Sequence, residues 1–155
     1  MQYGRTINMN IEELREDLKR DEGIVYEIYL DHLGLPTFGI GHLVTDKDPE
    51  HGLDVGTKID EARCYEAFEK DLETVIADCQ ILYPDFDDLP EEAQSIIANM
   101  MFNMGRPRLS KFKGMKAGVD ERNWERAADE MVDSRWYNQV QKRADRLVVR
   151  MRAIS

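Results

Sequence analysis

One short segment limits the folds that are open to this chain. Residues 24–44 are rich in β-branched and aromatic side chains and contain a turn at Leu33-Gly34-Leu35-Pro36, so we expect strands there. On both sides of this segment, apolar residues recur mostly at helical spacing. One small sheet among many helices predicts an α+β fold that is mostly helical.

The segment that precedes the strands predicts a first helix. Asn10 can cap its N-terminus, with Glu13 three residues later as in a capping box. Leu14 and Leu18 then lie on one face of the helix. Gly23 suits the left-handed position that follows a helix, so we expect the helix to end just before it.

The remainder of the chain predicts a loop followed by helices. Residues 45–56 are polar and rich in turn formers, and Thr57 or Asp60 can cap a long helix that runs to about residue 80. After an interruption at Tyr83-Pro84-Asp85, further helical patterns occur near 90–104, 121–133 and 135–153, with shorter pieces around Leu109–Ala117. The layout predicts a small α/β lobe, a connecting helix and an all-helical lobe, with a cleft between the lobes for an elongated substrate.

Composition is typical of a globular protein. The chain has 155 residues, enough for one domain, and 42% of them are hydrophobic. It contains no apolar run long enough to span a membrane, and its N-terminal segment lacks the apolar core of a secretory signal. We therefore expect a protein that cannot leave the cytoplasm by itself.

The two cysteines fit a reducing compartment. Cys64 and Cys79 both fall on the predicted long helix. Their separation in sequence corresponds to roughly 22 Å along a helix, which is too far for a disulfide. We expect both to be small core residues with free thiols.

The net charge of −10 is unevenly distributed. Residues 99–155 carry 13 basic and 7 acidic side chains, a net charge of +6, whereas 1–56 and 57–98 carry −7 and −9. This asymmetry indicates an anionic partner for the C-terminal third, although ordinary solvated helix faces explain it equally well. A nucleic-acid-binding module fits poorly because the whole chain is strongly acidic.

Two acids nine residues apart carry the most specific chemistry. Glu22 falls at the end of the first predicted helix and Asp31 at the end of a β-rich run, with Thr37 on the returning strand. A hairpin of this kind can bring a carboxylic acid, a carboxylate and a hydroxyl to one cleft. Paired acids in unlike environments are typical of glycoside hydrolysis. The alternative for either acid alone is a solvated surface charge, since the chain holds 31 acidic residues.

A metal site is a weaker alternative. His32, His42 and His51 are separated by ten and nine residues, which fits no standard zinc pattern. We expect no metal and no cofactor, because acid–base chemistry with water suffices.

Several motifs together resemble a known family. Asp21-Glu22-Gly23, Ile28-Tyr29-Leu30-Asp31 and Thr37-Phe38-Gly39-Ile40-Gly41-His42-Leu43 are similar to the catalytic lobe of phage-type lysozymes, the T-even phage endolysins of glycoside hydrolase family 24. Asn99–Gly105 resembles the family's helix along the cleft, and Ser134-Arg135-Trp136-Tyr137-Asn138-Gln139, followed by Arg143-Ala144, resembles its signature. The resemblance runs from about residue 12 to 150. It implies one lysozyme-like domain over 1–155, with a first lobe at about 12–59, a connecting helix at about 60–80 and a helical lobe at about 81–155.

The resemblance also implies residue roles. Glu22 corresponds to the general acid, Asp31 to the second carboxylate and Thr37 to the hydroxyl that helps hold the attacking water, in a reaction that inverts the anomeric carbon. The remaining matched positions are an arginine that pairs with the acid, a supporting salt bridge and sugar-contacting residues: Arg143; His42 and Asp71; Leu43, Phe102 and Asn103.

Some features depart from the family pattern. Asn103 stands where a glutamine is usual, and His32 follows Asp31 where relatives carry a small polar residue. The chain ends at Ser155, where relatives often continue with a short helix, and we expect residues 1–9 to cover the surface which that helix would occupy.

The activity implied by the resemblance is that of a muramidase that hydrolyses the β-1,4 bond between N-acetylmuramic acid and N-acetylglucosamine in peptidoglycan. The implied biology is an antimicrobial phage endolysin, a monomer that waits in the host cytoplasm until a holin releases it to the cell wall. Two other classes stay open: a lytic transglycosylase, which needs only one catalytic acid, and a silent wall-binding protein.

Overall fold

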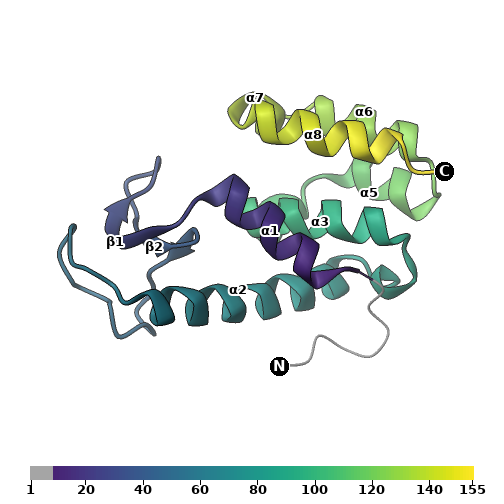
Figure 1. Ribbon diagram of the computed structural model, residues 1–155. Coiled ribbons are helices and arrows are strands. Elements are labelled where there is room, and N and C mark those ends of the chain that lie inside the picture. Colours follow the sequence, from purple (N-terminus) through teal and green to yellow (C-terminus); the bar gives the residue numbers. More distant parts are fainter. Residues whose placement is uncertain (1–8) are drawn as a thin grey trace. The chain divides into compact units, whose positions relative to one another are not determined.

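The computed structural model describes residues 9–155 of the chain. Within them the elements follow one another as α1 (Ile11–Glu22), β1 (Val25–Leu30), β2 (Pro36–Gly39), β3 (His42–Leu43), α2 (Glu61–Leu82), a 3₁₀ turn (Phe86–Asp88), α3 (Glu91–Met104), α4 (Arg106–Leu109), α5 (Lys113–Asp120), α6 (Trp124–Val132), α7 (Arg135–Gln139) and α8 (Gln141–Arg152). Helices dominate, and the three strands form one antiparallel sheet (Figure 1). The predicted fold class is confirmed.

The chain forms two compact units. One is Arg15–Thr74, and the other is Val75–Ser155 together with the segment that ends at Leu14. The boundaries fall inside α1 and α2, so each of these helices contributes to both units. The expectation about residues 1–9 falls almost wholly on residues 1–8, which lie outside the described part of the chain.

The sheet gives the unit Arg15–Thr74 its core. Its strands pair in the order β1-β2-β3, and the chain between β3 and α2 is the predicted loop. Ile28 of β1 and Phe38 of β2 are buried against the start of α2. The buried residues of this cluster are Ile28, Phe38, Ile59, Cys64 and Ala67.

The ends of α1 follow the sequence prediction in part. Glu13 donates its backbone N–H to Oδ1 of Asn10 over 3.1 Å, so Asn10 is the predicted N-cap. A capping box also requires the Glu13 side chain to accept the backbone N–H of Asn10. That part of the prediction is wrong, because this N–H donates to Oε1 of Glu91 of α3 over 3.1 Å. At the other end, Gly23 adopts a φ of +74° and donates to the carbonyl of Lys19, as predicted.

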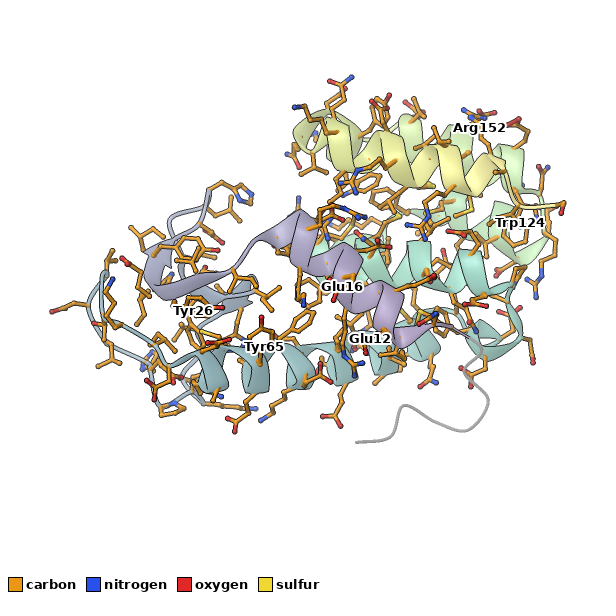
Figure 2. The ribbon with its side chains drawn as sticks, viewed as in Figure 1. Glu12, Glu16, Tyr26, Tyr65, Trp124 and Arg152 are labelled. Atoms are coloured by element: carbon orange, nitrogen blue, oxygen red, sulfur yellow. The ribbon has the colours of Figure 1, made fainter. Side chains whose placement is uncertain are left out.

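The second unit is helical. In it α8 packs against α3 and α6, and α5 packs against α6 (Figure 1). The approach of α5 to α6 requires glycine, because a Cβ on Gly118 would lie 2.7 Å from the backbone nitrogen of Ala127. Arg152, near the end of α8, forms ion pairs with Glu125 and Asp129 of α6, the helix that begins at Trp124 (Figure 2).

The helical pattern predicted near 135–153 is confirmed, but the segment contains a break. The segment forms α7 and α8, and the helical backbone breaks at Val140, where φ is −128° and ψ is 49°. Ser134 begins α7 as its N-cap, since its Oγ accepts the backbone N–H of Tyr137 over 3.2 Å. Neither glycine nor proline marks Val140, so helical spacing alone did not reveal the break.

One further expectation, about the cysteines, is met on the described residues. Cys64 and Cys79 both lie on α2, and both are buried and free. Among residues 9–155, no helix combines the length and the apolar character that a membrane crossing requires.

Candidate active site

The sheet presents one row of side chains across its three strands. Tyr29 of β1 lies opposite Thr37 of β2, and Thr37 lies opposite Leu43 of β3. Directly opposed residues in an antiparallel sheet point to the same face, so these three side chains share one face. The adjacent pair, Phe38 and His42, points to the other face, where Phe38 belongs to the core.

Asp31 extends this row beyond the end of β1. Its backbone N–H donates to the carbonyl of Leu35 over 3.0 Å, which continues the pairing of β1 with β2. Asp31 therefore shares the face of Tyr29, two residues earlier. Its Oδ1 accepts the backbone N–H groups of Leu33 (2.8 Å) and Leu35 (2.9 Å). These bonds orient the carboxylate and leave Oδ2 as the oxygen that can accept a proton from a ligand.

The Thr37 side chain is also fixed by its contacts with the protein. Its side chain is buried, and its Oγ1 donates a hydrogen bond to the carbonyl of Leu35 over 2.9 Å. Because its hydrogen is used in this way, the hydroxyl can act toward a ligand only as an acceptor.

Glu22 meets the sheet at the turn between β2 and β3. It is the last residue of α1, and its carboxyl group packs over Gly41, where an added Cβ would lie 2.6 Å from Oε1. Gly41 also adopts a φ of +63°, which disfavours any residue with a side chain. The glycine-rich segment noted in the sequence therefore makes room for this acid.

Tyr29 lies close enough to Glu22 and Asp31 for their charges to affect the pKa of its phenol. Burial raises the pKa of the Tyr29 phenol, and the charges of Glu22 and Asp31 raise it further. Glu22 and Asp31 therefore act on one half-buried side chain, and both belong to the unit Arg15–Thr74. Sequence analysis missed Tyr29, because its place opposite Thr37 depends on how β1 pairs with β2.

His42 lies between two carboxylates. Its Nδ1 is 2.7 Å from Oδ2 of Asp71 on α2, and its Nε2 is 2.9 Å from Oδ2 of Asp48 in the loop. Both ring nitrogens are thus occupied, so His42 cannot serve as a metal ligand without losing these bonds, and His32 and His51 are exposed. Burial lowers the pKa of His42, but the hydrogen bonds and charges of Asp71 and Asp48 outweigh burial and raise it above its usual value.

Arg63 of α2 extends this cluster. Its guanidinium pairs with Oε2 of Glu50 over 2.8 Å and with Oδ1 of Asp48 over 3.2 Å, and it lies over the ring of Phe38. Glu50 is almost completely buried. These contacts fix the loop between β3 and α2. Sequence analysis missed both Arg63 and Glu50, because their pairing joins an irregular loop to a helix and follows no helical or strand spacing.

The helical unit holds the remaining predicted residues. Arg143 of α8 is buried, and its Nε donates to Oδ1 of Asn99 over 2.8 Å while a terminal nitrogen donates to the Asn99 carbonyl over 3.3 Å. The buried Asn99 therefore supplies two acceptors that orient the arginine.

The three predicted sugar contacts differ in their surroundings. Asn103 accepts the indole N–H of Trp136 at Oδ1 over 2.7 Å, so its amide NH₂ is the group that can face a ligand. Phe102 is half-buried and Leu43 is exposed in the row of the sheet. Leu43 belongs to one unit, and Phe102 and Asn103 belong to the other. Their contact with a substrate stays a prediction.

Comparisons with known proteins identify relatives across most of the chain. The family model of phage lysozyme matches residues 19–153. Probable T4-type lysozymes 2 and 1 of Dictyostelium discoideum are 32% and 29% identical, each across 89% of this chain and 92% of the relative. The pre-baseplate central spike protein Gp5 of Enterobacteria phage T4 is 31% identical across 92% of this chain, which corresponds to 27% of that longer protein.

The family model and the first relative each cover most of the chain. They show that the chain belongs to the phage lysozyme family and is a lysozyme-type glycoside hydrolase.

Proposed function

We propose that this protein is a muramidase that hydrolyses the β-1,4 bond between N-acetylmuramic acid and N-acetylglucosamine, with inversion at the anomeric carbon. One observation carries the proposal: Asp31 and Thr37 share a face of the sheet with Tyr29, and the Glu22 carboxyl group packs over Gly41 at the turn between β2 and β3 of the same sheet. Unlike acids beside a buried hydroxyl are the arrangement that acid–base glycoside hydrolysis requires.

In the proposed reaction Glu22 is the general acid. It gives its proton to the glycosidic oxygen as the bond to the anomeric carbon breaks. A water molecule adds to that carbon from the opposite face and gives one proton to Oδ2 of Asp31, while Thr37 accepts a hydrogen bond from the other. The products are two shorter glycans, with the new anomeric hydroxyl inverted.

Arg143 and His42 have supporting roles in the proposal. Arg143 would pair with the general acid, and the His42–Asp71 pair would hold the sheet on α2. Leu43, Phe102 and Asn103 would contact sugar rings. The reaction uses water and two carboxyl groups, so we propose no cofactor and no metal.

The proposed biological role is that of a phage endolysin acting on bacterial peptidoglycan as a monomer. The protein would remain in the host cytoplasm until a holin opens the membrane, and hydrolysis of the wall would then cause lysis. The family model, which is that of phage lysozymes, supports this role. The similarity to the Gp5 spike protein favours a second role, in which the domain acts at the start of infection.

The enzymatic proposal is tested by digesting purified peptidoglycan and measuring the mass of the fragments. We expect fragments that have gained water, whereas a lytic transglycosylase would release anhydro sugars. Glu22→Gln and Asp31→Asn should each lower the rate at least 100-fold, while the matched control Asp46→Asn, in the exposed loop, should not change it. Wild-type-like activity in Asp31→Asn would contradict the proposal, and equal inactivity of all variants and the wild type would indicate a silent binder.

The two biological roles are separated by expression in a host with and without a holin. Lysis that depends on both proteins supports the endolysin role. Presence of the protein in purified virions, with no lysis on coexpression, would instead assign it to entry.

A further inference from the structure

We propose that the Tyr29 hydroxyl donates a hydrogen bond to the attacking water and is the third protein group that fixes it, beside Asp31 and Thr37. This inference rests on the proposed hydrolysis with inversion. It assigns a catalytic contact to a residue that sequence analysis did not select.

Strand register places Tyr29 at the water site. Tyr29 and Thr37 are directly opposed across β1 and β2, so their Cβ atoms lie about 5 Å apart on one face. Asp31 follows on the same face, because its backbone pairs with Leu35 in continuation of the ladder. A phenol reaches further from the sheet than the short side chains of Asp31 and Thr37. The Tyr29 hydroxyl can therefore reach the space above the Asp31 and Thr37 side chains.

The hydroxyl of Tyr29 is available for a ligand. The side chain is half-buried, and within residues 9–155 no protein group is hydrogen-bonded to it. The neighbouring acids also keep it a donor at neutral pH, since their charges and burial raise the pKa of the phenol above its usual value near 10. A protonated phenol beside two carboxyl groups can supply a hydrogen bond that neither an aspartate nor an acceptor hydroxyl can.

The hydrogen bonds that Asp31 and Thr37 already form within the protein determine which of their atoms can bind the attacking water. Oδ1 of Asp31 is occupied by two backbone N–H groups, so Oδ2 accepts one hydrogen of the water. Thr37 has donated its hydrogen to Leu35, so its Oγ1 accepts the second. The water then has two lone pairs. One accepts the Tyr29 hydroxyl and the other points to the anomeric carbon, which completes a tetrahedral arrangement.

Tyr29→Phe tests the inference, and Tyr26→Phe is the matched control. Tyr26 lies on the same strand, but it is exposed and its side chain is hydrogen-bonded to Tyr65 of α2 (Figure 2). On soluble peptidoglycan fragments, Tyr29→Phe should lower kcat about tenfold with KM within twofold of the wild type, and Tyr26→Phe should change neither. Both variants should unfold at about the wild-type temperature, and kcat is expressed per folded molecule.

A double-mutant cycle with Thr37→Val adds a measurement that a purely structural role would not reproduce. If both hydroxyls hold one water, the fold-losses in kcat of the single variants should not multiply in the double variant. Multiplicative losses, a kcat of Tyr29→Phe within twofold of the wild type, or a loss confined to KM would each overturn the inference. Failure of the proposed function is distinguishable, because the wild type would then release no hydrolysed fragments or Asp31→Asn would remain active.

Discussion

His42 and Asp71 are joined by a 2.7 Å ion pair between β3 and α2. The opposite ring nitrogen of His42 is 2.9 Å from Asp48, so one imidazole connects the sheet, the loop and the helix. The side chains of His42 and Asp48 are largely buried, which makes these contacts more valuable than exposed ion pairs. His42 thus fixes the face of the sheet opposite to the one that carries Asp31 and Thr37.

This pair predicts a pH-dependent contribution to stability. The pKa of His42 is raised in the folded protein, so its stabilisation is fully present below the unfolded value of about 6.5 and is lost as pH rises through the folded value. Asp71→Asn should therefore lower the free energy of unfolding by about 2 kcal/mol at pH 5.5, and by less at pH 9. Urea unfolding at both pH values measures this, with Asp46→Asn as control. An equal cost at both pH values would contradict it.

The carboxyl groups of Glu50 and Asp48 predict a loss of stability at low pH. Hydrogen bonds from Arg63 lower the pKa of Glu50 more than burial raises it, and the pKa of Asp48 is lowered because bonds from Thr45 and His42 outweigh burial. Their stabilisation is present above the ordinary carboxyl pKa values near 4 and is lost as pH falls through the lower folded values. Thermal unfolding from pH 2 to 9 should show maximal stability between about pH 4.5 and 6.5. A protein whose stability is constant between pH 2 and 5 would contradict this.

Gly41→Ala should separate backbone strain from displacement of the general acid. Both Gly41 and Gly52 have positive φ, but only at Gly41 would a Cβ meet Glu22, at 2.6 Å, whereas nothing lies within 4 Å at Gly52. Each alanine should cost about 1–2 kcal/mol in a urea unfolding experiment. Only Gly41→Ala should lower kcat, by at least tenfold, because it moves the Glu22 carboxyl group. Equal activity of the two variants would show that the position of Glu22 is not critical.

Asn99→Ala should destabilise the helical unit by about 1–3 kcal/mol, because it removes a buried acceptor from Arg143. Asn138→Ala, at an exposed position of α7, should change stability by no more than about 0.5 kcal/mol. Urea unfolding of both variants measures the difference. Similar costs would show that Asn99 does not stabilise the protein by orienting Arg143.

Wall binding should depend on unpaired cations. Lys111 and Lys113 line part of a surface hollow of about 180 Å³, whose wall also includes Glu130 and Asp133. Neither lysine forms an ion pair within the described part of the chain. Arg106 pairs with Asp78 instead, so it should contribute less. Replacing both lysines with glutamine should weaken binding to isolated cell walls, more at low salt than at high salt.

The matched control for this experiment removes two paired cations. Lys116→Gln/Arg126→Gln lowers the net charge equally, but these side chains already pair with Asp120 and Glu121. The control should bind nearly as well as the wild type. An equal loss in both double variants would make total charge, and not this surface, the determinant.

Local signals in the sequence were sufficient for much of the fold. Asn10, Gly23 and the polar loop 45–56 mark the element boundaries through their own backbone preferences, so the elements could be predicted without knowledge of tertiary contacts. The break at Val140 was not predictable in this way, because it depends on how α7 and α8 pack. Neither was the acceptor for the Asn10 N–H, which Glu91 supplies from a distant part of the sequence.

The residues of the candidate site also differ in whether the sequence alone could indicate them. Glu22, Asp31 and Thr37 could be selected from spacing and resemblance, since they lie on consecutive local elements. Asn99, Arg63 and Tyr29 could not be given roles before register and burial were known. Each depends on a neighbour brought near by the fold: Arg143, Glu50 and Thr37.

The central claim is that a water held by Asp31 attacks while Glu22 protonates the leaving oxygen. Proton NMR of the first sugar released from peptidoglycan fragments, recorded before mutarotation, tests it most directly. If the reaction inverts the anomeric carbon, the α anomer of the new reducing end appears first. Initial release of the β anomer would show retention and would contradict the roles proposed for Asp31 and the water.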